Sequence, residues 1–362
     1  MIGPKLGSLS QGEWPAGSGC ASEPEKEWNF MDANNPEVVV VTGASAGVGR
    51  ATVREFGKRG ARVGLLARNP DGLEGARKEV EALGGKALAI PTDVADPGAV
   101  EAAAEKVEEE FGPIDVWVNG AMTTVFGEFK NVTPEEFRRG TKVTYLGAVY
   151  GTMAALKRML PRDRGTIVQV GSALSYRAIP LQSVYCGAKH GMRGFTDSVR
   201  TELMHDGSNV HITMVQLPGL NTPQFDHCET KMPNHPQPVP PIYQPEIAAD
   251  AIYWAAHHNR REVYVGASSV MTIIGTKLAP WLGDIYLART AYSGQQTDER
   301  VSPSRPSNLF EPVSGDRGAH GSFDLQSHEK SPQLWATKNR GWLTLAGAGV
   351  AAGAILAAWR ER

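Results

Sequence analysis

Three side chains that could move a proton are spaced so that a strand end and one helix would bring them together. Lys189 follows Tyr185 at the fourth position, and Ser172 lies thirteen residues before the tyrosine. Residues four apart share one face of a helix. An ammonium about 4 Å from a phenol is worth up to ~4 kcal/mol at an effective dielectric constant of ~20. We therefore expect Lys189 to lower the pKa of Tyr185 from ~10 toward ~7.

This trio suits acid–base chemistry at a carbonyl or an alcohol. Tyr185 could donate a proton to a carbonyl oxygen or accept one from an alcohol, while Ser172 holds the same oxygen by a hydrogen bond. A nicotinamide would transfer the hydride. Taken separately, a Tyr and a Lys four residues apart are common on solvated helices, and a serine after a strand is commonly a turn residue.

A glycine-rich loop upstream gives the trio its context. An apolar strand predicted at 37–41 leads into T-G-A-S-A-G-V-G, which opens a helix. Gly43 would permit the tight turn, Gly47 would let the backbone approach a diphosphate, and Gly49 would let strand and helix pack closely. Free N–H groups at a helix start attract phosphate; an ordinary tight turn is the alternative. The predicted cofactor contacts here are Thr42, Gly43, Ser45, Gly47, Val48 and Gly49.

The end of the next predicted strand favours NADP(H), with NAD(H) as the alternative. An acid there would bond the ribose 2′-OH of NAD. Here Ala67 is neutral and Arg68 follows, and a guanidinium suits a 2′-phosphate; a solvated surface cation is the other interpretation of Arg68. Asp93 could accept a hydrogen bond from the adenine amino group, or it could be an acid at the start of the helix that contains Pro97.

The elements that must position these residues alternate between short β-branched runs and helical patterns. Strands rich in Val and Ile with intervening helices predict a parallel sheet covered on both faces. Right-handed crossovers then give a Rossmann-like, doubly wound α/β fold. The predicted strands are 37–41, 62–66, 86–90, 115–118, 166–170, 210–216 and 261–265. The predicted helices are 50–59, 73–82, 99–111, 134–159, 184–204 and 246–257.

Over residues 36–266 these motifs resemble the short-chain dehydrogenase/reductase family. The resemblance rests on the glycine loop, Asp93, the run N-G-A at 119–121, the Ser/Tyr/Lys trio and the run P-G-L-N-T at 218–222. It implies a single NAD(P)-dependent oxidoreductase domain in which Ser172, Tyr185 and Lys189 are catalytic. It also implies that Tyr185 and Lys189 contact the cofactor and that Asn119 supports the central strand and the adenosine pocket. On the same pattern, the nicotinamide is flanked by Pro218, Gly219 and Thr222.

Two positions depart from the family's pattern. Met122 stands where the family has a small residue, so it would crowd the cofactor cleft or line the substrate pocket. Thr144 stands where the resemblance places a catalytic Asn that holds a water in a proton relay. The Thr144 hydroxyl could still bind water, with a different geometry. The effect of this replacement is left open.

Four regions differ in composition. We expect a flexible arm over 1–35, the cofactor-binding domain over 36–275 and a linker-like tail over 276–340. Residues 341–359 are uncharged, carry Trp342 and Trp359 near their ends and have basic flanks. As a helix they would span about 28 Å, close to a bilayer core. The alternatives are a transmembrane helix and a helix packed on a partner.

Composition excludes several classes of protein. With a net charge of −2, the chain has no basic surplus for nucleic acid. Its three scattered cysteines fit a reducing, cytoplasmic compartment, and no spacing suggests a metal. The family commonly forms homo-oligomers, which we expect here too. The predicted substrate contacts are Tyr176, Ile179, Gln182 and the proline-rich loop at 231–245.

Three functions remain open. The leading hypothesis is a carbonyl reductase or alcohol dehydrogenase acting on a small or lipophilic molecule. The second is a membrane-tethered NADP-binding scaffold with little or no turnover, which Thr144 and the long tail motivate. The third is a nucleotide-sugar epimerase of extended type, which would show a G-x-x-G-x-x-G loop and a folded C-terminal substrate domain.

Overall fold

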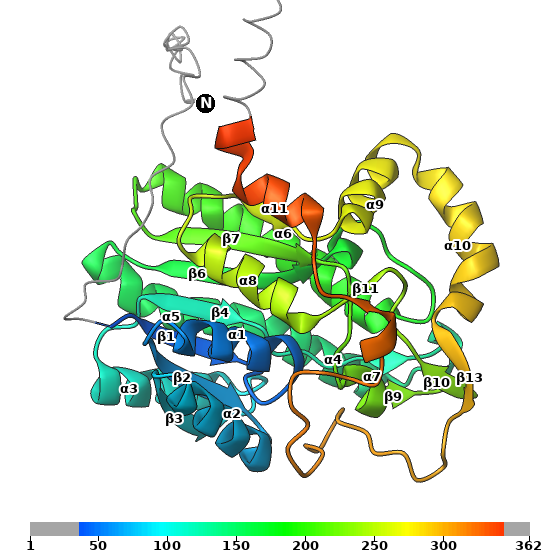
Figure 1. Cartoon of the computed structure of the whole chain (residues 1–362), viewed down its shortest axis with the longest axis horizontal. Coiled ribbons are helices and arrows are strands. Elements are labelled where there is room, and N and C mark those ends of the chain that lie inside the picture. The colour runs from blue at the N-terminus through cyan, green and yellow to red at the C-terminus, as the bar shows by residue number, and fades with distance from the viewer. Residues whose placement is uncertain (1–35, 344–362) are drawn as a thin grey trace, which may run out of the picture.

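A seven-stranded parallel sheet forms the centre of the molecule in the computed structural model, which describes residues 36–343 (Figure 1). The strand order is β12-β7-β6-β4-β1-β2-β3. The chain builds outward from β1 to β3 and then crosses to β4 on the other side of β1. Their bounds are β1 Val38–Thr42, β2 Arg62–Ala67, β3 Lys86–Pro91, β4 Val116–Asn119, β6 Thr166–Ser172, β7 His211–Leu217 and β12 Glu262–Tyr264. This reversal of order opens a crevice at the carboxyl ends of β1 and β4.

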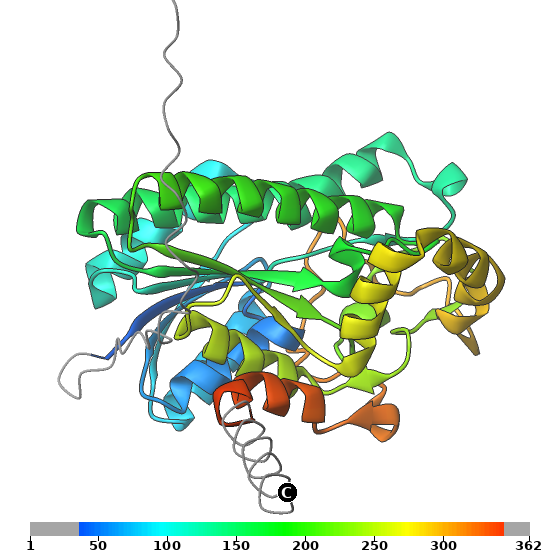
Figure 2. The same ribbon diagram turned by 90° about the horizontal axis from the view of Figure 1, so that it is seen from above.

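Helices cover both faces of the sheet, as the view along it shows (Figure 2). Val39 and Val41 pack with α1 (Gly47–Gly57), α2 (Pro70–Ala82) and α8 (Pro245–Ala256). Val38 and Val40 point to the other face, as neighbouring strand residues do. There they pack with α3 (Pro97–Phe111) and α5 (Gly147–Met159), and the long α6 (Ser183–His205) lies beside them. The predicted doubly wound α/β fold is therefore confirmed.

The predicted helical stretch over 134–159 is confirmed, but it is not a uniform α-helix. It consists of α4 (Pro134–Thr141), a π-helical turn at Lys142–Leu146 and α5. Thr133 caps α4: its hydroxyl accepts from the Glu136 N–H, and the Glu136 carboxylate accepts from the Thr133 N–H. Wide turns of this kind are commonly found at functional sites, and this one contains Thr144.

The expectation of a linker over 276–340 is wrong. The segment contains the end of α9 (Ala267–Leu278), then α10 (Pro280–Gly294), β13 (Gln296–Arg300), β14 (Ser327–His328) and α11 (Pro332–Lys338). Its Ser, Pro, Gly and Asp residues resembled a linker because such residues also build ordered loops whose polar groups are bonded to the domain. The segment is held by apolar side chains, since Leu309, Phe323 and Leu334 are buried.

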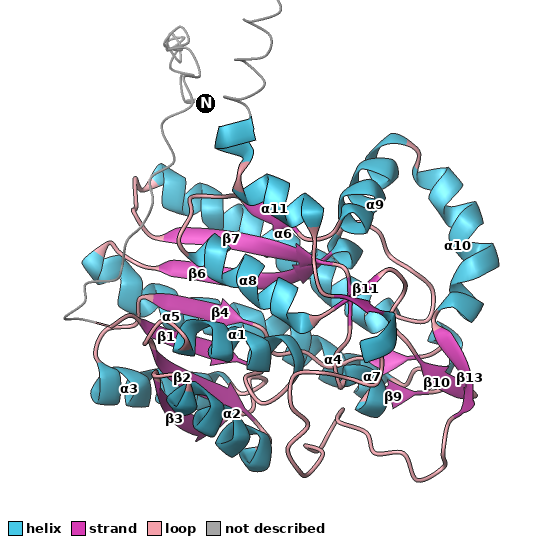
Figure 3. Ribbon diagram, in the orientation of Figure 1, coloured by secondary structure: helices cyan, strands magenta, loops and turns pink. Residues whose placement is uncertain are grey.

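Small elements complete the rim of the crevice. The short strand β13 pairs with β10 (Asn234–Pro236), and β14 pairs with β11 (Ile242–Tyr243), which in turn pairs with β8 (Gly219–Leu220). Two further strands, β5 (Val125–Phe126) and β9 (Glu229–Thr230), pair beside the short helix α7 (Gln224–His227). The proline-rich segment thus contains two short strands within an extended path (Figure 3).

Two expectations fall on residues that the structure does not describe. The arm over 1–35 lies outside the described residues, as does the apolar segment 341–359 apart from its first three residues. Within residues 36–343, no helix has the length and apolar character needed to cross a bilayer. The transmembrane helix therefore stays a prediction.

Candidate active site

The trio singled out from the sequence comes together at the carboxyl end of β6. Ser172 is the last residue of β6, and Tyr185 lies in the first turn of α6 with Lys189 one turn later. The Ser172 side chain lies close enough to the Tyr185 hydroxyl to lower its pKa, and it accepts a bond of 3.1 Å from the Leu174 N–H. The Lys189 Nζ lies 5.5 Å from the centroid of the Tyr185 ring. The three residues therefore lie together, as their spacing in the sequence predicted.

The expected lowering of the Tyr185 pKa is wrong for this structure. Burial raises the pKa of Tyr185 to about 12, although the Ser172 side chain opposes this rise; Tyr185 remains partly exposed and lines the cavity. Burial also lowers the pKa of Lys189 to about 7. The Lys189 Nζ donates to the Val170 carbonyl oxygen at 2.5 Å. Desolvation disfavours both the Tyr185 phenolate and the Lys189 ammonium. The expectation from the sequence considered only the attraction between the two groups and not their desolvation.

The glycine loop has the geometry that a diphosphate needs. Gly43 and Gly47 have φ values of +75° and +56°, where a side chain would be strained. A Cβ on Gly49 would lie 2.1 Å from the Gly43 carbonyl oxygen. No side chain caps the start of α1; the Gly47 N–H donates instead to the Gly318 carbonyl oxygen at 3.0 Å. The residues present therefore fit a dinucleotide.

A cavity of about 550 Å³ runs along the carboxyl ends of the strands. It is lined both by the glycine loop and by the trio, and Met122 lies on its wall as expected. Ile179, Gln182 and residues 238–240 of the proline-rich loop also line it. The predicted cofactor and catalytic residues on its lining are Gly43, Ser45, Gly47, Val48, Gly49, Arg68, Asp93, Ser172, Tyr185, Lys189, Pro218, Gly219 and Thr222.

Thr42 and Asn119 do not line this cavity; their side chains form hydrogen bonds that hold neighbouring parts of the sheet and its loops. The Thr42 hydroxyl accepts from the N–H groups of Gly120 and Ala121 at 3.0 and 3.1 Å. The buried Asn119 amide accepts from the Trp117 indole at 2.8 Å and donates to Thr152 at 3.1 Å. The Asn119 side chain is thus bonded within the core, and it is not among the residues that line the cavity.

At the expected adenosine end, the side chains of Arg68 and Asp93 already bond to other groups of the protein. The Arg68 guanidinium donates to the carbonyl oxygens of Asn308 and Phe310. Asp93 forms an ion pair with Arg139 at 2.8 Å and accepts from the Ala95 N–H at 3.0 Å. Asp93 is not the cap of α3, since Asp96 fills that role.

Thr144 and Tyr176 do not act as expected. Thr144 is fully buried, and its hydroxyl donates to the Thr123 carbonyl at 2.7 Å and accepts from the Thr123 N–H at 3.0 Å. Both bonds tie the π-helical turn to the strand-end loop, so this hydroxyl is not directed to the cavity. The Tyr176 hydroxyl donates to Glu262, away from the predicted substrate contacts.

Sequence reasoning missed one part of the site, which we call the strap (residues 305–321). Asn308, Pro312, Val313 and Arg317 of the strap line the cavity, and α9 and α10 add Ser268, Thr272, Tyr286 and Leu287. In Figure 1 the strap is the orange loop that passes in front of α7 and reaches α2 and α1. No short motif marks it, because its bonds to Arg50, Arg68 and Asn69 join it to residues more than two hundred positions earlier in the chain.

The described part of the chain contains no evident metal-binding site. Between residues 36 and 343, no group of three His, Cys, Asp or Glu side chains could hold a metal ion. Cys186 and Cys228 are buried free thiols.

Comparisons with known proteins agree with the fold and the cavity. The family described as short chain dehydrogenase matches residues 37–232. The uncharacterized oxidoreductase YxnA of Bacillus subtilis (strain 168) is 33% identical over 290 residues, which cover 78% of this chain and 81% of that protein. A 3-dehydrosphinganine reductase of Danio rerio is 35% identical over 192 residues, which cover 52% of this chain and 57% of that enzyme.

A solved structure carries the same arrangement with a dinucleotide. The metagenomic short-chain oxidoreductase in complex with NADP superposes with a TM-score of 0.54 and 28% identity, covering 64% of this chain and 97% of that one. The family match over residues 37–232 and the relative that is 33% identical show that this chain belongs to the short-chain dehydrogenase family.

Proposed function

We propose that this chain is an NADP(H)-dependent oxidoreductase that interconverts a carbonyl and an alcohol, with Tyr185 as the general acid and base. The observation that carries the proposal is that Ser172, Tyr185 and Lys189 line the same cavity as the glycine loop. The nicotinamide would supply or accept the hydride, and the protein would orient the reacting oxygen and move its proton.

The raised pKa of Tyr185 favours the direction of reduction. With a pKa of about 12, the phenol keeps its proton at neutral pH and can donate it to a carbonyl oxygen. The Ser172 hydroxyl holds that oxygen beside the phenol. Lys189, with a pKa near 7, changes its charge close to neutral pH, and its charged form stabilises a phenolate beside it.

Charge at the adenosine end supports NADP(H) over NAD(H). Burial and then the neighbouring charge of Arg139 lower the pKa of Arg68, whereas the charges of Asp93 and Glu311 oppose this effect. The support for NADP(H) comes from the position of Arg68 on the cavity lining. A 2′-phosphate would replace two neutral carbonyls as the acceptor for Arg68. Arg68→Asp should therefore weaken NADPH more than NADH in a binding titration, and equal losses would remove Arg68 from the recognition of the 2′-phosphate.

The cavity walls favour a lipophilic substrate. Leu174, Ile179, Phe225, Val239 and Leu287 give the end near Tyr185 an apolar surface. Among the relatives, one is a 3-dehydrosphinganine reductase and another is the ketoacyl reductase HetN of Nostoc. We propose a ketone carried on a long aliphatic or aromatic group.

Turnover distinguishes this enzyme from the scaffold hypothesis. Purified protein with NADPH and a panel of aliphatic and aromatic ketones should oxidise the cofactor, and Tyr185→Phe should lose about 10²–10⁴-fold of that rate. Tyr292→Phe, on the exposed side of α10, is the matched control. Oxidation no faster than in Tyr185→Phe would favour a binding scaffold, which the fully engaged Thr144 hydroxyl also suggests.

Two further expectations from the sequence, oligomerisation and membrane attachment, are also part of this proposal. We propose a homo-oligomer, which sedimentation would measure. We also propose that residues 341–359 hold the protein at a membrane. Deleting residues 341–362 should then move the protein from the membrane fraction to the supernatant, and unchanged partitioning would favour a helix packed on a partner.

A further inference from the structure

The strap crosses the cavity where a cofactor diphosphate would lie. The Gly47 N–H, at the start of α1, donates to the Gly318 carbonyl oxygen at 3.0 Å. Three residues later, the Gly321 N–H donates to the Asn221 carbonyl oxygen at 3.4 Å. The strap therefore joins the glycine loop to the loop at 218–222, the two elements that flank the cofactor in the proposed function. Arg317, next to Gly318, lines the cavity between them.

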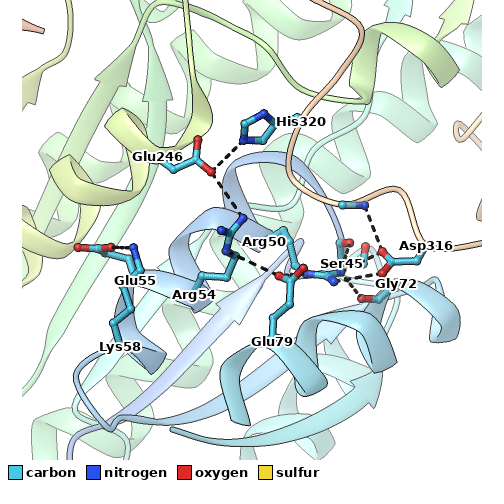
Figure 4. Close-up of polar contacts among 11 residues, drawn as sticks. Ser45, Arg50, Arg54, Glu55, Lys58, Gly72, Glu79, Glu246, Asp316 and His320 are labelled. Atoms are coloured by element: carbon cyan, nitrogen blue, oxygen red, sulfur yellow. Dashed lines mark hydrogen bonds and ion pairs between the residues drawn. The ribbon is translucent and has the colours of Figure 1, made fainter. Parts of the chain in front are cut away.

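Ion pairs fix the strap on one side of Arg317. Two bonds of 3.0 and 3.1 Å join Asp316 to the Arg50 guanidinium (Figure 4). Arg50 is only 1% exposed and also bonds Glu79 at 2.7 Å and the Gly72 carbonyl at 2.8 Å. Asn69 adds bonds to the carbonyl oxygens of Val313 and Gly315 at 2.9 and 2.8 Å.

A second set of contacts fixes the strap on the other side. His320 bonds Glu246 and Asp324, each at 2.9 Å, and Glu246 also lies 3.5 Å from Arg54 on α1 (Figure 4). Ala319 is buried between Ala51 and Ala249. With anchors on both sides, the backbone that carries Arg317 is held in place before any ligand arrives.

The Arg317 guanidinium is itself little used by the protein. It donates one bond of 3.1 Å, to the Ser314 carbonyl, and forms no ion pair with a carboxylate in the described part of the chain. The side chain is exposed on the cavity wall. Its charge, together with that of Arg305 and after the larger effect of burial, lowers the pKa of His227 to about 4. The histidine is therefore neutral at pH 7, and the positive charge here belongs to arginine.

We propose that Arg317 binds the diphosphate of the dinucleotide, so that the strap is a part of the cofactor site. This inference rests on the proposed function. A guanidinium beside the N–H groups of a helix start can form charge-assisted bonds with phosphate oxygens. The C-terminal segment thereby adds a cation to a loop that otherwise binds phosphate through backbone groups alone.

Equilibrium binding tests this role directly. The dissociation constants of NADPH and NADH would be measured by isothermal titration for the full chain and for Arg317→Ala, Arg317→Lys and the control Arg289→Ala. Arg289 is an exposed cation on α10. Arg317→Ala should weaken both dinucleotides by about tenfold and by the same factor, because both carry the diphosphate. Arg317→Lys should retain part of the affinity, and Arg289→Ala should match the wild type.

The strap anchor gives a second, independent variant. Asp316→Asn leaves Arg50 paired with Glu79, so the protein should still fold, which thermal unfolding would check. The variant should weaken both dinucleotides, and adding Arg317→Ala should cost less than it does in the wild type, because the two residues act through one element. Fully additive losses would contradict the link between the anchor and Arg317.

The outcomes separate the two levels of the proposal. If the wild type binds neither dinucleotide, the proposed function and this inference both fall. If the wild type binds NADPH and Arg317→Ala binds it equally well, the inference falls and the function stands. A loss confined to NADPH would place Arg317 at the 2′-phosphate and would overturn its role at the diphosphate.

Discussion

The catalytic end and the adenosine end of the cavity are built in different ways. Ser172, Tyr185 and Lys189 lie within one stretch of eighteen residues, on the end of β6 and the first two turns of α6. The adenosine end joins the glycine loop and Arg68 to strap residues about 240 positions later. The catalytic geometry therefore depends on local spacing, whereas the adenosine end depends on long-range docking.

The two ends also differ in their electrostatics. Burial dominates at the catalytic end, where it raises the pKa of Tyr185 and lowers that of Lys189. At the adenosine end, the guanidinium groups of Arg50, Arg68 and Arg139 bond acids or carbonyls. We thus expect variants at the first end to change turnover, and variants at the second to change affinity.

After Tyr185→Phe, the largest effect should follow from Ser172→Ala. Removing one donor to the reacting oxygen costs about 10²–10³ in turnover in comparable sites. The substitution also removes the hydroxyl that lowers the Tyr185 pKa. The NADPH dissociation constant should change less than about twofold, with Ser198→Ala on the exposed face of α6 as the control. A loss of affinity as large as the loss of turnover would break the division between the two ends.

Gly49→Ala should act on affinity and stability instead. The added Cβ would lie 2.1 Å from the Gly43 carbonyl oxygen, so the glycine loop must shift. Overpacking of this kind costs about 1–3 kcal/mol, measurable by urea unfolding, and NADPH binding should weaken with it. Gly194→Ala, in α6 with open space around it, is the control and should be neutral or slightly stabilising. Equal stability of the two variants would contradict the close packing at Gly49.

Lys189→Met tests the effect of burial on the pKa of Lys189. The folded protein releases the Lys189 proton near pH 7, whereas the unfolded chain keeps it to about 10.5. The unfolded state therefore binds more protons between these values, and the free energy of unfolding should rise with pH by up to about 1.4 kcal/mol per unit. Urea titrations at pH 7 and pH 9 should show this rise in the wild type and its loss in Lys189→Met. The same rise in both proteins would show that Lys189 titrates normally.

Thr144→Val should have the smallest effect on catalysis. Its hydroxyl bonds only Thr123 among the described residues, and its loss leaves a buried carbonyl and N–H unpaired, which costs about 1–3 kcal/mol of stability. Turnover should stay within about threefold of the wild type. A much larger loss of turnover, with stability unchanged relative to the exposed control Thr201→Val, would show that Thr144 takes part in a proton relay after all.

Much of this protein follows from patterns of short range. A repeat of about 3.6 residues per turn places Tyr185 and Lys189 on one face of α6, and alternating Val residues place β1 in the centre of a sheet. Glycines in a strand–loop–helix context predicted the loop at 43–49. These features depend only on neighbouring residues, so the fold class, the position of the cavity and the proximity of Ser172, Tyr185 and Lys189 could be predicted from the sequence.

Tertiary structure alone decided the rest. Asp316 meets Arg50 across 266 positions, and no periodicity links two residues so far apart. The pKa of Tyr185 moves upward because desolvation depends on what surrounds the phenol, which spacing does not describe. Arg68 and Thr144 likewise have residue types that suit a ligand, but their hydrogen bonds go to backbone groups that folding brought within reach. Spacing along a chain fixes direction and proximity within an element; solvent exclusion and long-range pairing arise only when the elements pack.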